Sequence, residues 1–394
     1  MRRIYFENSG DKMKVALVHD FITKIGGAER VLLILHKIFP EAPIYTLLYD
    51  KKTTRNLFEN SDIRTSNLQK YPTFIRKRSR LLFSKFPQAI EQFDFSEFDL
   101  VISSSNSFAH GIITSPETLH ITYCYSPMRY SWDWAQKYLA ENNIGFGLLG
   151  LFIRSQISKI RLWDFYASKR TDFWIAISKT VARRIKKYYR TDSKVIYPPT
   201  EISNLLKSKK PAKDYYLIVS RLTQYKNIDL AILAFNKLRL PLYIIGEGQD
   251  LQRLKSLAKE NVKFLDWQND KDRDDYLSEC KAFVFPGEDD FGLTPVEAMA
   301  TGRPVIALNA GGVTETVVAG VTGEFFEDTN STDDLEKTVR KVENNFHYRP
   351  EDCQKQAEKF SEEIFIKNFK QFIEEKYKSF SSHYKKDKEA EHSS

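Results

Sequence analysis

The sequence is poor in cysteine and has no long hydrophobic run. Its three cysteines, Cys124, Cys280 and Cys353, are far apart and lack the close spacing of metal ligands. This argues against a disulfide framework and against a structural zinc site. No apolar stretch reaches membrane-spanning length, and no signal-peptide pattern opens the chain. These absences favour a reducing, cytoplasmic environment.

Signatures of several cofactors and ligands are also missing. The stretch Lys14–His19 is a strand candidate, followed by the turn Gly26-Gly27 and an amphipathic helix over Val31–Ile38. The turn lacks the third glycine of the dinucleotide fingerprint, so NAD is not expected. The pair Asp272-x-Asp274 lies in a charged helical stretch and is not a clear metal site. We therefore expect no metal and no other cofactor.

Two α/β domains are expected from the 394 residues. Strand candidates in the first half are Lys14–His19, Ala42–Tyr49, Leu100–Ser103, His120–Cys124 and Phe173–Ile177. Those in the second half are Tyr215–Ser220, Leu242–Gly246, Val262–Leu265, Ala282–Phe285 and Pro304–Ala307. Helical patterns separate them, which is typical of parallel sheets with helices on both faces. Pro198-Pro199 marks a linker. We expect an arm over 1–12, domains over 13–198 and 199–378, and a disordered tail over 379–394.

The net charge of +8 predicts an anionic partner. Basic and aromatic residues alternate in Gln69–Phe95, which predicts contact with an anionic membrane surface. The alternative is a pair of helices that cover the first domain with a solvated basic face. Nucleic acid is not an expected partner, because no nucleic-acid-binding motif accompanies the charge.

The most informative stretch is Gly287–Gly302, GEDDFGLTPVEAMATG. A strand candidate, an acidic turn and a helix start follow one another here, and Thr294 is the expected N-cap. A helix N-terminus after a buried strand is a typical anion site. Asp289 and Glu297 are eight positions apart, so both can reach one small polar ligand. Glu297 could instead only complete a capping box.

A second charged pair follows the first strand of the second half. Arg221 and Lys226 are five positions apart in SRLTQYKN. Two cations at a strand end can hold a diphosphate through charge-assisted hydrogen bonds. Surface pairs of this spacing are common. The pair Arg221 and Lys226 is therefore informative only in combination with the acidic turn.

Together these motifs resemble glycosyltransferase family 4. DDFGLTPVEA resembles its E-x7-E element, with Asp289 in place of the first glutamate, Glu288 as an alternative and Glu297 as the second. Arg221 and Lys226 match its R-x4-K pair. The D-F-G form resembles the mannosyltransferase-like branch of O-antigen and exopolysaccharide clusters. The resemblance implies the GT-B fold: two Rossmann-like doubly wound domains facing each other across a cleft, with a C-terminal helix that crosses back.

The resemblance also implies site residues. Arg221, Lys226, Asp289 and Glu297 would be catalytic. The expected donor-binding residues are Gly26, Gly27, Gly246, Glu288, Phe291, Gly292, Leu293 and Thr294. The family branch has a histidine where this chain has Tyr125, within YCYSPMRYSWDW. Tyr125, Arg129 and His110 are the acceptor-binding candidates; the alternatives are a packed loop end and a surface loop.

The implied reaction is retaining, metal-independent transfer of a hexose from a nucleotide diphosphate sugar, with GDP-mannose favoured. The acceptor would be a glycan or lipid-linked glycan in cell-surface polysaccharide synthesis, at the inner face of the plasma membrane. A non-catalytic GT-B subunit and a nucleotide-sugar epimerase of the same fold are the alternatives. A phosphorylase would need a pyridoxal-binding lysine, for which the sequence offers no candidate.

Overall fold

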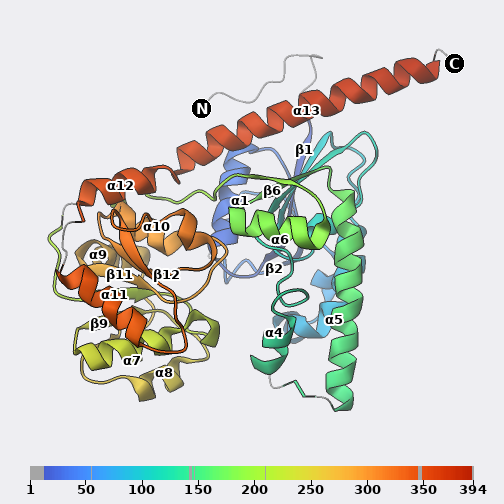
Figure 1. Ribbon diagram of the computed structural model, residues 1–394. Helices are drawn as coiled ribbons and strands as arrows, with labels where there is room; N and C mark the ends of the chain where they lie inside the picture. Colours follow the sequence, from blue (N-terminus) through green and yellow to red (C-terminus); the bar gives the residue numbers. More distant parts are fainter. Residues whose placement is uncertain are drawn as a thin grey trace. The chain divides into compact units, whose positions relative to one another are not determined.

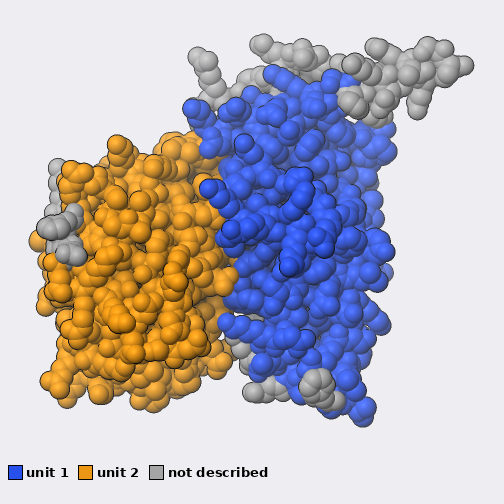
Figure 2. Space-filling view, viewed as in Figure 1, with its two compact units in different colours: residues 1–196, 366–394 blue, residues 197–365 orange. Residues whose placement is uncertain are grey.

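The computed structural model describes residues 13–392 except 55, 142–143, 146, 209 and 345–347. It divides into two compact units (Figure 2): residues 1–196 with 366–394, and residues 197–365. The expected boundary lay two residues later, and the expected second domain included the return helix. Within the described part of the chain, no helix combines the length and the hydropathy needed to cross a bilayer.

The first unit contains a seven-stranded parallel sheet of order β3-β2-β1-β4-β5-β6-β7. The strands are β1 Val15–Ile22, β2 Ile44–Tyr49, β3 Ile63–Thr65, β4 Leu100–Ser105, β5 Leu119–Cys124, β6 Phe173–Ala176 and β7 Ser193–Val195. The helices are α1 Gly27–Ile38, α2 Thr73–Lys77, α3 Phe86–Glu91, α4 Ala135–Glu141, α5 Leu148–Ala167 and α6 Lys179–Tyr189 (Figure 1). The central strands are buried on both faces, as parallel sheets require.

The second unit contains a six-stranded parallel sheet of order β10-β9-β8-β11-β12-β13. Its strands are β8 Tyr216–Val219, β9 Leu242–Ile245, β10 Val262–Phe264, β11 Ala282–Phe285, β12 Val305–Leu308 and β13 Gly323–Phe326. Its helices are α7 Ile228–Leu238, α8 Leu251–Leu257, α9 Asp270–Glu279, α10 Leu293–Ala300, α11 Asp333–Asn344 and α12 Pro350–Glu358. The expected alternation of strands and helices in two parallel sheets is confirmed.

Three strands have no counterpart among the sequence predictions: β3, β7 and β13. Each lies at an edge of its sheet and has three or four residues. Short edge strands need no continuous apolar run, because one side faces away from the sheet. The sequence pattern therefore carries little signal for them.

The last helix, α13 Glu362–His392, leaves the second unit and returns to the first. Phe369 packs edge-on against Tyr123, and Phe372 packs edge-on against Phe173, with ring centroids 6.1 and 6.5 Å apart. The helix continues through most of the stretch after Ser379 that we expected to be disordered. That stretch contains several Lys and Glu residues, which extend a helix once it is nucleated. The expected arm over 1–12 lies outside the described residues.

Candidate active site

The expected donor residues of the second unit lie where its sheet reverses strand order. The chain forms β8, β9 and β10 on one side and then returns to form β11 beside β8. Loops at the carboxyl ends of two such strands diverge and leave a crevice, which is the usual ligand position in open α/β sheets. Arg221 follows β8, and the acidic turn Glu288–Gly292 follows β11. The fold therefore brings the two predicted charged motifs to one edge of the sheet.

The backbone of the acidic turn is held by close contacts with the loop after β12. The amide of Gly312 donates a hydrogen bond to the carbonyl of Asp289, at 2.8 Å. A Cβ on Gly312 would lie 2.3 Å from Phe291 Cα, so no larger residue fits without a backbone shift. Phe291 is 3% exposed and packs against Tyr197 and Phe360. These contacts give the carboxylates of the turn a rigid support.

Lys226 and Asp289 form an ion pair with each other. The ammonium lies 2.5 Å from Asp289 Oδ1 and also contacts Oδ2. Lys226 is 8% exposed, and its charge lies 5.6 Å from the centre of the Phe285 ring. The Cα of Lys226 would lie 2.8 Å from a Cβ on Gly287, so the lysine loop and the acidic turn are in direct backbone contact. The pairing of these two side chains was not predicted.

Glu297 is a buried carboxylate with an incomplete set of partners. It is 9% exposed, and its Oε2 has no hydrogen-bond partner among the described residues. The other oxygen, Oε1, lies 3.9 Å from Arg273 Nη2. Burial by itself lowers the pKa of Arg273, but the charges of Glu297 and Asp274 outweigh burial and raise it. A buried acceptor left unpaired is costly, and such atoms in native proteins often mark ligand sites.

The capping prediction for this helix is wrong. Helix α10 begins at Leu293, and its N-cap is Gly292 in a left-handed conformation with φ 87° and no side-chain cap. Thr294 therefore lies inside the first turn, and Glu297 is two positions further along than a capping box requires. Leu293 and Thr294 are half-buried, as is Glu288, whose side chain lies beside Gly311.

Arg221 is exposed, and its side chain makes no hydrogen bond or ion pair within the described part of the chain. Its loop is tied to the loop after β9, because the amide of Leu222 donates to the carbonyl of Glu247 at 2.9 Å. Gly246 completes this contact: a Cβ there would lie 1.9 Å from the carbonyl oxygen of Ser220. The guanidinium of Arg221 can therefore contact a ligand, while the backbone on both sides of this residue is held in place.

The two carboxylates of the Asp272-x-Asp274 pair, on α9, are engaged with neighbouring residues. Asp272 bonds with the side chain of the N-cap, Asn269, and Asp274 is paired with Arg273 at 2.8 Å. Arg273 itself was not predicted as a site residue. It lies in a run of alternating charges, and only the packing of α9 beside α10 brings it to Glu297.

The first unit has a cavity of about 440 Å³ at its own reversal point, between β1 and β4. Charged and polar side chains from three loops line it: His19, Asp20, Lys24, Glu29, Tyr49, Asp50, Arg76 and Asn106. Asp20 accepts hydrogen bonds from the four consecutive amides of residues 106–109, which fixes the loop after β4 to the end of β1. The site predictions for this unit included none of these lining residues.

Helix α1 begins at the cavity. Its N-cap, Gly26, has no side-chain cap, and Ala28 and Glu29 line the cavity wall. Burial raises the pKa of Glu29, but the hydrogen bond and charge of His19 outweigh it, so the pKa is lowered overall. An ionised carboxylate therefore lies beside Gly26 and Gly27. This negative charge distinguishes the turn from a simple phosphate-binding loop.

The predicted acceptor residues do not line this cavity. The phenol of Tyr125 is buried and donates to the carbonyl of Ala28 at 3.1 Å, and it lies 2.8 Å from Ser104 Oγ. Burial raises its pKa well above the usual range. Tyr125 thus stabilises the first turn of α1 through its hydrogen bond to Ala28. Arg129 stacks on the Trp134 ring at 3.4 Å and lies 3.7 Å from Asp133, which matches the packed-loop alternative.

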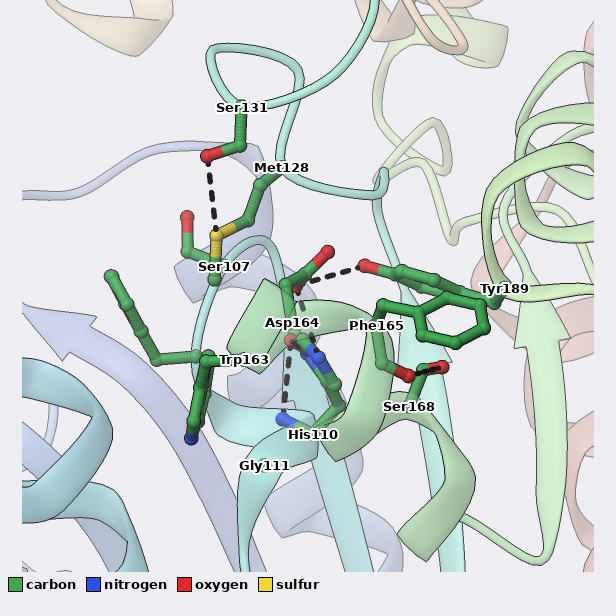
Figure 3. Close-up of polar contacts among 12 residues, drawn as sticks. Ser107, His110, Gly111, Met128, Ser131, Trp163, Asp164, Phe165, Ser168 and Tyr189 are labelled. Atoms are coloured by element: carbon green, nitrogen blue, oxygen red, sulfur yellow. Dashed lines mark hydrogen bonds and ion pairs between the residues drawn. The ribbon is translucent and has the colours of Figure 1, made fainter. Parts of the chain in front are cut away.

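His110 belongs to a separate buried network (Figure 3). Its Nε2 lies 3.2 Å from Asp164 Oδ1, and the same oxygen accepts a hydrogen bond from the Tyr189 hydroxyl at 3.1 Å. Asp164 Oδ2 accepts from Trp132 Nε1 at 2.7 Å. Both His110 and Asp164 are fully or almost fully buried. The network joins α5 and α6 to the sheet.

Similar sequences are found among known proteins. Residues 204–360 match the family described as glycosyl transferases group 1. This region is nearly the whole second unit, where the paired charges lie. An uncharacterized glycosyltransferase of Methanocaldococcus jannaschii is 25% identical over 57% of this chain and 65% of its own length. The alpha-1,3/1,6-mannosyltransferase ALG2 of Candida glabrata is 26% identical over 78% of each chain.

Solved structures show the fold of both units. Anabaena HepE, solved in complex with UDP, has a TM-score of 0.65 at 18% identity, covering 92% of this chain and 100% of its own. Sucrose-phosphate synthase of Thermosynechococcus elongatus has a TM-score of 0.71 at 14% identity, covering 93% and 100%. The expected GT-B fold of two Rossmann-like domains is confirmed. The family match over residues 204–360 supports a glycosyltransferase.

Proposed function

We propose that the protein is a retaining, metal-independent hexosyltransferase of glycosyltransferase family 4 that uses a nucleotide diphosphate sugar, with GDP-mannose favoured. The observation that carries this proposal is the set of charges at the reversal point of the second sheet. An exposed Arg221, the Lys226–Asp289 pair and a buried Glu297 with an unpaired oxygen lie on loops from one sheet edge or on the helix that follows. Mannose is favoured because the ALG2 relatives are mannosyltransferases by name.

In the reaction, the bond between the sugar anomeric carbon and the diphosphate oxygen breaks, and a bond to the acceptor hydroxyl oxygen forms on the same face. The acceptor proton passes to an oxygen of the departing diphosphate. Negative charge grows on the diphosphate, and Arg221 and Lys226 stabilise it. Because two cations do this, no metal is required.

The pairing of Lys226 with Asp289 adds a step to donor binding. A diphosphate competes with Asp289 for the ammonium, and the carboxylate that it displaces becomes available to the hydroxyls of the donor sugar. Glu297 binds the ribose hydroxyls with its unpaired oxygen. The amides of Phe291, Gly292 and Leu293, at the start of α10, orient the phosphates.

The acceptor is a glycan or lipid-linked glycan of a cell-surface polysaccharide such as O-antigen, bound by the first unit. Its polar cavity has the size and the hydrogen-bonding groups for a sugar, and Arg76 and Lys24 are among its lining residues. We also propose that the protein works as a peripheral protein on the inner face of the plasma membrane, where a lipid-linked acceptor would be available.

Alanine substitution tests the two cations. Arg221→Ala and Lys226→Ala should each lower kcat/KM for sugar transfer by roughly tenfold to 150-fold, the range for one charge-assisted hydrogen bond. Lys263→Ala, at an exposed lysine of β10, is the matched control and should leave kcat/KM unchanged. Activity of both cation variants within threefold of the parent would remove the pair from the mechanism.

Two further measurements separate the remaining alternatives. A panel of nucleotide sugars in a thermal-shift assay identifies the donor, since a bound donor raises the unfolding temperature by mass action. Excess chelator should leave turnover intact. Donor binding with no transfer to any acceptor would favour the non-catalytic subunit, and conversion of the donor without an acceptor would favour the epimerase.

A further inference from the structure

Helix α5 carries an apolar outer face that nothing in the described structure covers. Thirteen large hydrophobic residues are exposed among the side chains that the structure describes, and five of them lie on this one helix. They are Leu148, Leu151, Phe152, Leu162 and Tyr166, with exposed fractions from 53% to 89%. Their spacing follows the helical repeat, so all five lie on one face, in two groups near the two ends of the helix with exposed Ser155 and Lys159 between them.

This apolar face cannot turn inward, because the opposite face of α5 is already packed. Ile157, Ile160 and Ala167 are buried against the unit. Asp164 fixes the rotation of the helix, since it accepts a hydrogen bond from Trp132. It also accepts a hydrogen bond from Tyr189 and lies beside His110 (Figure 3). A helix that is apolar on both faces is expected inside a protein or a membrane, not at a water-exposed surface.

The charges that α5 presents to its surroundings are positive. Its sequence contains Arg154, Lys159, Arg161 and Asp164 as the only charged residues, and Asp164 is 0% exposed. Lys159 is exposed on the same side as the apolar face by its spacing from Leu162 and Tyr166. Helix α6, joined to α5 through the Asp164–Tyr189 hydrogen bond, carries exposed Lys187, whereas its Lys186 is paired with Asp192 at 2.8 Å.

The segment Gln69–Phe95, which the sequence analysis favoured for membrane contact, is mostly packed into the unit. Leu82 and Phe86 are 2% and 3% exposed, and Phe83 packs against Phe108 and Tyr130. Among its large apolar side chains that the structure describes, Phe74 is the exposed one, at 66%. This favours the alternative of helices that cover the core, and it leaves the membrane contact to another surface.

We propose that the outer face of α5 docks on an anionic lipid bilayer, with the helix lying in the plane of the interface. Leucine, phenylalanine and tyrosine side chains would enter the boundary between head groups and acyl chains, while Lys159 would extend its ammonium to lipid phosphates. This inference deepens the proposed membrane association and rests on it. It does not depend on which sugar is transferred.

A bilayer fits this face better than a second copy of the chain. A symmetric pair of α5 helices would bury Lys159 of both copies, and no exposed acidic residue on α5 could pair with them. At a bilayer the same lysine remains at the head groups. Dimerisation is therefore an outcome that the test must detect.

Flotation with phosphatidylcholine vesicles that contain phosphatidylglycerol tests the proposal. The double substitution Phe152→Ser with Leu162→Ser should lower vesicle binding by at least roughly tenfold. The control is Leu233→Ser with Trp267→Ser, two exposed apolar residues of the second unit, and it should bind as the parent does. Lys159→Gln should weaken binding to these vesicles and not to pure phosphatidylcholine.

A fluorescent probe gives a second measurement on the folded parent surface. The three native cysteines are buried, so Phe152→Cys can be labelled selectively with an environment-sensitive dye. Its emission should shift to the blue when vesicles are added, and the emission of a dye on Leu233→Cys should not. Sugar transfer to a water-soluble acceptor should be equal for the parent and the serine variant, which separates this proposal from the transferase assignment.

Three results would overturn the proposal. The first is a parent protein that does not float with the anionic vesicles. The second is a serine variant that binds as the parent does, or a dye at position 152 that does not respond. The third is a parent that is dimeric in solution and a serine variant that is monomeric, which would assign the face to a second copy.

Discussion

Glu297→Gln separates the binding role of Glu297 from a structural role. The carboxylate is 9% exposed, with one oxygen unpaired and Arg273 at 3.9 Å from the other. Removing the charge relieves a burial cost of several kcal/mol and forfeits an attraction of about 4 kcal/mol at an effective dielectric constant near 20. Arg273 keeps Asp270 and Asp274 as partners. We therefore expect the free energy of unfolding to change by less than about 1 kcal/mol.

Donor affinity should respond differently to the same substitution. A hydrogen bond from a ribose hydroxyl to an ionised carboxylate contributes about 1.5–3 kcal/mol, so the donor Kd should rise by roughly tenfold to 150-fold. The assay is isothermal titration with the cognate nucleotide sugar, together with urea unfolding of the donor-free protein. The two measurements report on separate consequences of one charge.

Glu324→Gln is the matched control in the same unit. Glu324 is also buried, at 6% exposed, but Lys341 and the Tyr348 hydroxyl satisfy it at 2.7 and 2.8 Å. Loss of the Glu324 charge should lower the free energy of unfolding by about 1–2 kcal/mol; the figure is small because Lys341 is more than half exposed and water screens the ion pair. Donor affinity should not change. If Glu297→Gln instead destabilised the protein by more than about 2 kcal/mol and bound donor normally, Glu297 would be structural and our reasoning refuted.

Three more substitutions test the supporting structure. Asp164→Asn should lower the free energy of unfolding by about 2 kcal/mol or more, because His110, Tyr189 and Trp132 lose a charged acceptor. Urea unfolding measures this change, and a decrease of less than about 0.5 kcal/mol would contradict the prediction. Gly312→Ala should displace the acidic turn and weaken donor binding, whereas Gly320→Ala, where a Cβ meets no atom within 4 Å, tests backbone strain alone. Burial lowers the pKa of His120 to about 3, so its stabilising contribution is present above about pH 6.5 and is lost as pH falls toward 3, by up to about 1.4 kcal/mol per pH unit. His120→Asn should flatten that part of the stability–pH curve, and equal slopes for the two proteins would contradict the assignment.

The sequence by itself determined the class of fold and the location of the charged motifs. Buried parallel strands are apolar along their whole length, so β4, β5 and β11 were predicted close to their observed bounds, whereas β1 extends past the predicted end at His19 to Ile22. Loops at the carboxyl ends of such strands gather at one edge, which is why Arg221 and Asp289 could be assigned to a common region. Edge strands such as β3 lacked this signal.

Only the tertiary structure decided which side chains meet. The Lys226–Asp289 pair, the approach of Arg273 to Glu297 and the cavity at His19 and Asp20 depend on contacts between loops that are distant in the sequence. The apolar residues of α5 and of Gln69–Phe95 also look alike in the sequence. Which set is exposed depends on the way each helix is rotated against the sheet, and Asp164 fixes that rotation for α5 through partners on other elements.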